Sequence, residues 1–205
     1  MSIVKLNNNG VKNATAFGSI TGLGSLIFIK KITASSSATV SFVDGSSDVV
    51  LDDTYKEYLF TFNNIHASTQ AHFQVNFSID SGSNYNVTKT TTFFFASHNE
   101  AGDSTSLSYQ GSYDLAQSTA AQPLGLSFSS DSDAGGAGYM HLFDPSNTTF
   151  AKNFISVAGG FTDSDYYNTN YVAGYCNTTS AVDAVQFSMA SGNIDAGDIC
   201  LYGIA

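Results

Sequence analysis

The chain has 205 residues, enough for one domain, and only 12% of them are charged, about half of the roughly 25% usual in globular proteins. All seven basic residues are lysine and 17 residues are acidic, so the net charge is −10; this argues against a nucleic-acid partner, which would be held by Lys and Arg on its phosphates. A membrane-spanning helix is excluded too, because the apolar runs are short, as in Leu26–Ile29, and such a helix needs about 20 residues.

The composition predicts an all-β protein. Arg is absent, and Glu and Met occur only two and three times, although these residues favour helices. Ser, Thr, Asn, Phe and Tyr are abundant, and they suit strands and turns. A helical bundle and a coiled coil are therefore excluded.

Residues 1–24 differ from the rest of the chain. They contain the run Asn7–Gly10 and further glycines at positions 18, 22 and 24, a composition typical of a flexible segment, and they lack the apolar stretch of a secretory signal. We interpret them as an N-terminal docking arm that becomes ordered on another subunit. The predicted apolar anchors of this arm are Ile3, Val4, Leu6 and Phe17.

From Ser25 onward, apolar residues that alternate with polar ones predict half-buried strands. The clearest case is Ala71–Asp80. The inward-facing residues predicted for these strands, in chain order, are Val40 and Phe42; Tyr58, Phe60 and Phe62; Phe73, Val75, Phe77 and Ile79; Val185, Phe187 and Met189; and Ile199, Leu201 and Gly203. Turn signals separate them, and Asp52–Glu57 is predicted as either one short helical turn or an irregular connection.

These strands predict a single domain over residues 25–205. About ten strands, no helical periodicity and no internal repeat favour an antiparallel β-sandwich of the jelly-roll type. The 16 Phe residues supply an aromatic core.

No metal site or cofactor is predicted. The histidines share no short motif, and neither His-Glu-x-x-His nor Cys-x-x-Cys occurs. Three aspartate pairs in turn-like segments are expected to be solvated, and calcium binding by one of them stays open. These pairs are Asp131 and Asp133, Asp163 and Asp165, and Asp195 and Asp198. Cys176 and Cys200 are expected to be free buried thiols, with one disulfide as the alternative.

No enzymatic activity is predicted. The chain lacks the Gly-x-Ser-x-Gly elbow and the glycine motifs that bind phosphate. Its 17 acidic residues leave glycoside hydrolysis by two carboxylates as an alternative.

The segment rich in tyrosine and asparagine at 166–171 is the best candidate for a sugar contact. Tyrosine offers an apolar face with a polar tip, and amides can hydrogen-bond to hydroxyls. The alternative is that these tyrosines line an interface or cap an edge of the sandwich. The predicted glycan-binding residues, expected on a loop, are Tyr166, Tyr167, Asn168, Asn170 and Tyr171.

The last part of the chain carries a recognisable pattern. Residues 174–204 read Gly-Tyr-x-Asn-Thr-Thr, Ala-Val-x-Ala-x-x-Phe, Ser-Gly-Asn-Ile-x-x-Gly and Leu-Tyr-Gly-Ile in order, and segments 51–60, 64–66 and 80–85 also fit. The pattern resembles that of small virion proteins of tailed phages, especially marine ones, and it extends over residues 25–205.

The resemblance implies a non-enzymatic fibre, spike or capsid-decoration component on the virion surface, and it transfers no catalytic residue. The implied partners are further copies of the chain, expected as a homotrimer, and other head or tail proteins. The alternative is the host-glycan-binding module of a tail fibre, and a polysaccharide depolymerase ranks below it.

Overall fold

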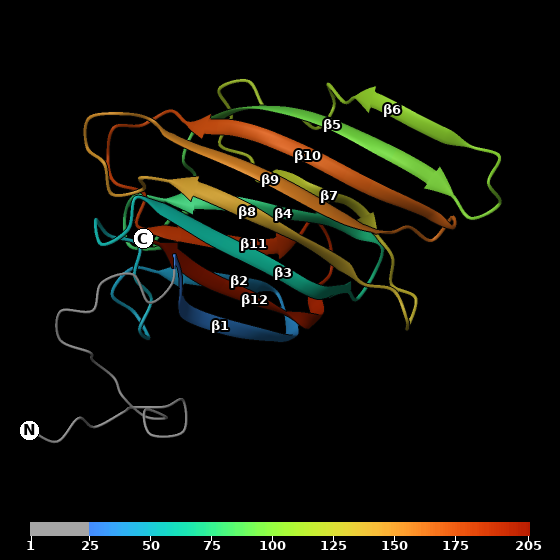
Figure 1. Ribbon diagram of the computed structural model, residues 1–205, viewed down its shortest axis with the longest axis horizontal. Helices are drawn as coiled ribbons and strands as arrows, with labels where there is room; N and C mark the ends of the chain where they lie inside the picture. Colours follow the sequence, from blue (N-terminus) through green and yellow to red (C-terminus); the bar gives the residue numbers. More distant parts are fainter. Residues whose placement is uncertain (1–24) are drawn as a thin grey trace, which may run out of the picture.

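The computed structural model describes residues 25–205, which form twelve antiparallel strands and no helix (Figure 1). The predicted docking arm, with Ile3, Val4, Leu6 and Phe17, lies outside the described residues. In the described part, no helix is present that could cross a membrane.

The strands run through the whole described chain. The first six are β1 (Leu26–Ser37), β2 (Thr39–Val43), β3 (Glu57–Ala67), β4 (Ala71–Ser78), β5 (Lys89–Asn99) and β6 (Thr105–Tyr109). The last six are β7 (Gln122–Phe128), β8 (Gly136–Phe143), β9 (Lys152–Phe161), β10 (Tyr166–Cys176), β11 (Ala184–Met189) and β12 (Ile194–Ile204).

The strands form two sheets of unequal width. The larger sheet has eight strands in the order β1-β12-β3-β8-β9-β10-β5-β6, and the smaller sheet has four in the order β2-β11-β4-β7. Figure 1 shows the larger sheet in front and the smaller sheet behind its β1 to β9 side, while β5 and β6 extend beyond it. The predicted antiparallel β-sandwich is confirmed.

An aromatic core lies between the sheets. Phe187 of β11 packs against Phe42, Phe60, Phe62 and Phe73, with ring centroids 5.2 to 6.3 Å apart. Most of these pairs are edge-to-face, a geometry that stabilises aromatic pairs beyond the area they bury. All five rings are 2% exposed or less, so the alternation expected for their strands is confirmed.

The interior is more polar toward β5 and β10, where the larger sheet outreaches the smaller one. Lys89 is fully buried, and its Nζ donates to Asn76 Oδ1 at 2.6 Å and to the Val87 carbonyl at 2.7 Å. Burial without a carboxylate partner lowers the pKa of Lys89 from 10.5 to about 8. Beside it, the Thr91 hydroxyl donates to buried Gln122.

One local expectation is corrected and two are settled. Ile79 lies after the end of β4 and is 41% exposed, because the chain turns at residues 79–83 instead of extending the strand. Asp52–Glu57 forms turns leading into β3, so its irregular alternative is the correct one. Cys176 and Cys200 are both free and buried, as expected.

Candidate functional site

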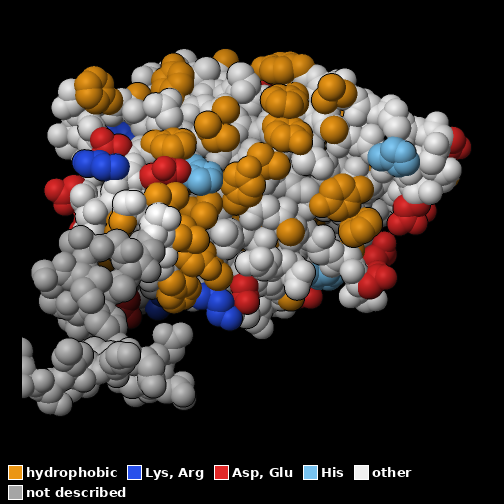
Figure 2. Space-filling view, in the orientation of Figure 1, with side chains coloured by type: hydrophobic (Ala, Val, Ile, Leu, Met, Phe, Trp, Pro, Cys, Tyr) orange, Lys and Arg blue, Asp and Glu red, His pale blue; other side chains and the backbone are white. Residues whose placement is uncertain are grey.

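The outer face of the eight-stranded sheet is unusually apolar. On an antiparallel sheet with one face in the core, the side chains that alternate with the core residues are normally polar. Here many of them are aromatic or aliphatic, and they come from β1, β12, β3, β8, β9, β10, β5 and β6. Figure 2 shows these side chains spread in bands across the sheet. We call this surface the outer face.

Strand register places five of these side chains in one row. Tyr139 of β8 lies opposite Val157, Val157 opposite Tyr171, and Tyr171 opposite Phe94, which pairs in turn with Tyr109 of β6. The Phe94 and Tyr171 rings are stacked, with centroids 4.9 Å apart. The row forms an apolar ridge that crosses five neighbouring strands. Its members are Tyr139, Val157, Tyr171, Phe94 and Tyr109, and we call it the ridge.

A second row runs beside the ridge toward the other edge of the sheet. Its members are Phe28, Tyr202, Leu59, His141, Ile155 and Ala173, each opposite the next. Phe28 packs edge-on against Tyr202, yet 57% of Phe28 and 48% of Ile155 remain exposed to solvent. Cross-strand aromatic and aliphatic pairs stabilise a sheet, but these side chains stay uncovered in the single chain.

The few charges on the outer face are paired within the chain. Glu57 contacts His141 Nδ1 at 2.5 Å, and Lys31 contacts Asp198 at 3.2 Å. Hydrogen bonds from the Thr33 hydroxyl and from Lys31 hold the pKa of Asp198 below its usual value.

The Tyr109 hydroxyl donates to Asp114, which raises the pKa of Tyr109. Tyr109 therefore remains uncharged at neutral pH. Among the described residues, the Asp114 carboxylate contacts no basic side chain, so one negative charge lies at the Tyr109 end of the ridge, while the other ridge residues carry no charge.

Two shallow hollows adjoin the ridge, one beside it and one at its Tyr139 end. One, of about 460 Å³, lies over Ala173 and is bordered by Ile155, Tyr175 and Thr92. The other, of about 420 Å³, lies over Ala137 and Gly138 beside Leu59. Small side chains on the outer face therefore leave space next to large ones.

The predicted glycan-binding residues do not form a loop. All five lie in β10, so the expected loop is wrong. This segment pairs with β5 on one side and β9 on the other. Because neighbouring residues of a strand face opposite ways, Tyr167 and Tyr171 point to the outer face, whereas Tyr166, Asn168 and Asn170 point inward. Asn170 is fully buried, and its amide donates to the Ala158 carbonyl at 3.0 Å, so it is not accessible for a surface contact.

Two of these residues line a separate polar hollow of about 360 Å³. It lies on the inner side of the larger sheet, next to the end of β7. Its lining is formed by Gln70, Phe95, Ser97, Ser127, Thr162, Ser164, Tyr166 and Asn168. Hydroxyl and amide groups above an aromatic floor have the chemistry of a sugar site.

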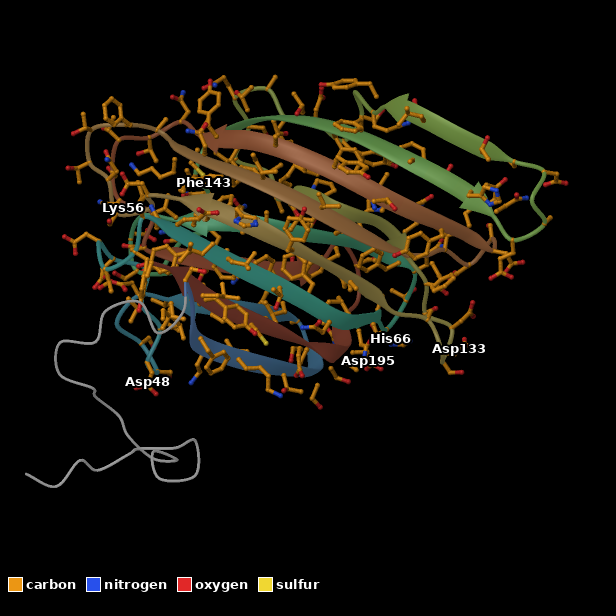
Figure 3. The ribbon with its side chains drawn as sticks, viewed as in Figure 1. Asp48, Lys56, His66, Asp133, Phe143 and Asp195 are labelled. Atoms are coloured by element: carbon orange, nitrogen blue, oxygen red, sulfur yellow. The ribbon has the colours of Figure 1, made fainter. Side chains whose placement is uncertain are left out.

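The acidic turns meet at one end of the sandwich. Glu100, Asp131, Asp133 and Asp165 line a hollow of about 330 Å³. Figure 3 shows Asp133 at this end, with His66 and Asp195 close to it. His66 Nδ1 lies 3.6 Å from Asp195 and its Nε2 lies 3.0 Å from the Asp131 carbonyl. Within residues 25–205, no three acidic, histidine or cysteine side chains are placed to hold a metal ion.

The outer face is the feature that the sequence interpretation missed. Its signal is visible in retrospect as segments in which alternation fails and both neighbours are large, such as Phe93–Phe95 and Tyr139–Phe143. Searches of family models, curated proteins and solved structures find no match to this chain.

Proposed function

We propose that the chain is a non-enzymatic structural protein of a phage virion surface, a fibre, spike or decoration component that works as an oligomer. The observation that carries the proposal is the apolar outer face. Monomeric proteins rarely expose continuous apolar areas beyond a few hundred Å², and larger ones mark interaction surfaces. The sequence resemblance to tailed-phage virion proteins supplies the virion part of the proposal.

A jelly-roll fold is part of this proposal, and the strand order supports it. Eight strands occupy the two sheets as β1-β12-β3-β8 and β2-β11-β4-β7, the arrangement of two Greek keys found in many capsid and lectin domains. The hairpins β5–β6 and β9–β10 are then insertions, and they join each other to widen the first sheet. This widening creates the part of the outer face that lies on β9, β10, β5 and β6.

The partners follow from the same proposal. They are further copies of the chain, with a homotrimer as the state expected from the resemblance, and neighbouring proteins of the head or tail. We assign no catalytic role to any residue.

Mass spectrometry of gradient-purified particles of the encoding virus tests the virion role. The chain should be present in a fixed copy number per particle that survives a salt wash. Its absence from purified particles, with normal expression in infected cells, would contradict the proposal.

A host-glycan-binding role is the second candidate, and the polar hollow beside Tyr166 and Asn168 favours it. Glycan-array binding of the wild-type chain should then disappear in Tyr166→Ala and Asn168→Ala but persist in Tyr167→Ala, since Tyr167 lies on the opposite face. Cleavage of a bound polysaccharide would instead identify a depolymerase. Loss of binding in Tyr167→Ala with retention in Tyr166→Ala would rule out this hollow.

A further inference from the structure

We propose that the outer face of the eight-stranded sheet binds the same face of a second copy of this chain. The inference rests on the self-assembly part of the proposed function and is independent of its location on a virion. Three features support a copy of the chain as the occupant: the area, the charge and the relief of the face.

The area of the face is sufficient for a stable contact. Eight strands spaced ~4.8 Å apart span about 34 Å, and eight residues along a strand cover about 27 Å. The whole sheet therefore has a projected face of ~900 Å², of the same order as the roughly 800 Å² that each partner of a stable complex contributes, so the contact would use most of the face. A small ligand would cover only a fraction of this surface.

The charge distribution suits contact between identical faces. The chain as a whole carries −10, so two copies repel unless they meet where charge is absent. The outer face is such a place, because Glu57 is paired with His141 and Lys31 with Asp198 in the same chain. Apart from Asp114 at the Tyr109 end of the ridge, the apolar rows offer an oppositely charged partner no charge to recognise.

The shape of the face, with raised side chains next to hollows, suits contact with an identical face. It carries the ridge, a hollow of about 460 Å³ beside it and a second hollow of about 420 Å³ at its Tyr139 end. When two such faces meet about a two-fold axis, each contact occurs twice and the ridge of one copy can enter a hollow of the other. Tyr139 borders one hollow and Ile155 the other, so both lie where the copies would interlock.

The test replaces one apolar side chain on the outer face by lysine. Ile155→Lys is suitable because the side chain is half exposed, and in a single chain a lysine there reaches water. Tyr139→Lys, at a residue 41% exposed on the neighbouring strand, is the second variant. Thr39→Lys is the matched control, because it adds the same side chain at an exposed position on the outside of the smaller sheet.

Sedimentation equilibrium of the full-length chain at neutral pH measures the result. The wild-type chain and Thr39→Lys should have the mass of an oligomer at micromolar concentration. The two-fold contact gives the mass of two chains. Ile155→Lys and Tyr139→Lys should weaken association at least ~100-fold, because each places unpaired charges in an apolar contact.

Either of two results would overturn the inference. One is an oligomer that persists unchanged in both variants; another surface then joins the copies, and the proposed self-assembly stands. The other is a monomeric wild-type chain. If the wild-type chain is monomeric and Ile155→Lys also lowers the unfolding temperature as strongly as a core substitution does, the face is covered within the same chain. Residues 1–24 are then the occupant of the face.

Discussion

The two outward surfaces of this sandwich are built from different residues, although both alternate with the same core. On the smaller sheet, Gln186 donates to Ser41 and Gln74 donates to Ser188 across neighbouring strands. On the larger sheet, the equivalent positions carry rings such as Phe94 and Tyr171. On the smaller sheet, these polar side chains are hydrogen-bonded to each other, and the surface is stable in contact with water. The larger sheet exposes apolar area whose removal from water would stabilise an assembly.

This contrast teaches that alternation in a strand identifies the face that is buried in the core. By itself it does not show whether the opposite face ends in solvent or contacts another molecule. A polar outer face shows that a sheet ends in solvent. An apolar outer face is typical of a sheet with a second contact, which is the basis of the proposed self-assembly.

The largest effect should come from the core that both sheets share. Phe187→Ala removes a fully buried ring that contacts four other rings, and it should lower the free energy of unfolding by about 3–5 kcal/mol. Ile155→Ala, on the outer face, should cost less than ~1 kcal/mol in a chain diluted to the monomer. Urea denaturation measures both; equal losses would mean that the outer face belongs to the folding core of the single chain.

A pH-dependent effect should come from the polar interior beneath β5 and β10. The pKa of Lys89 is about 8 in the folded chain, below its ordinary value of 10.5. Between these values the unfolded chain holds a proton that the folded chain has released, so the contribution of Lys89 to stability rises with pH by an amount on the order of 3 kcal/mol.

The measurement compares wild type with Lys89→Met from pH 7 to 10.5. Both chains are prepared with Cys176→Ala, because burial raises the pKa of Cys176 to about 12, its titration changes stability in the opposite direction, and its charge is coupled to that of Lys89. Relative to Lys89→Met, the chain that keeps Lys89 should gain stability with rising pH. Parallel curves would show that Lys89 keeps its ordinary pKa in the folded chain and is charged there.

The smallest effect should come from the polar outer surface. Gln186→Ala removes the hydrogen bond to Ser41 and should lower the free energy of unfolding by about 0.5–1.5 kcal/mol. Because this surface ends in water, the substitution should leave the sedimentation mass unchanged. A change of mass would place an interface on the smaller sheet and remove the contrast between the two surfaces.

Much of the fold followed from the sequence alone. The scarcity of helix formers and the alternation at Phe73–Phe77 and Val185–Met189 predicted an all-β sandwich with an aromatic core. These are local properties, because side-chain direction in a strand depends only on the parity of the residue number. Segment 166–171 was the main error: its Asn and Tyr residues resembled a loop, yet β5 and β9 pair with it on both sides.

The sequence by itself thus determined the fold class, most of the inward residues and the net negative charge. Only the tertiary structure decided that β5, β6, β9 and β10 widen one sheet beyond the other, and that Tyr139, Val157, Tyr171, Phe94 and Tyr109 fall in one row. These residues are separated by up to 77 positions in the chain, from 94 to 171, and strand register alone brings them together. A row across a sheet depends on which strands pair and in what register, which no local pattern encodes.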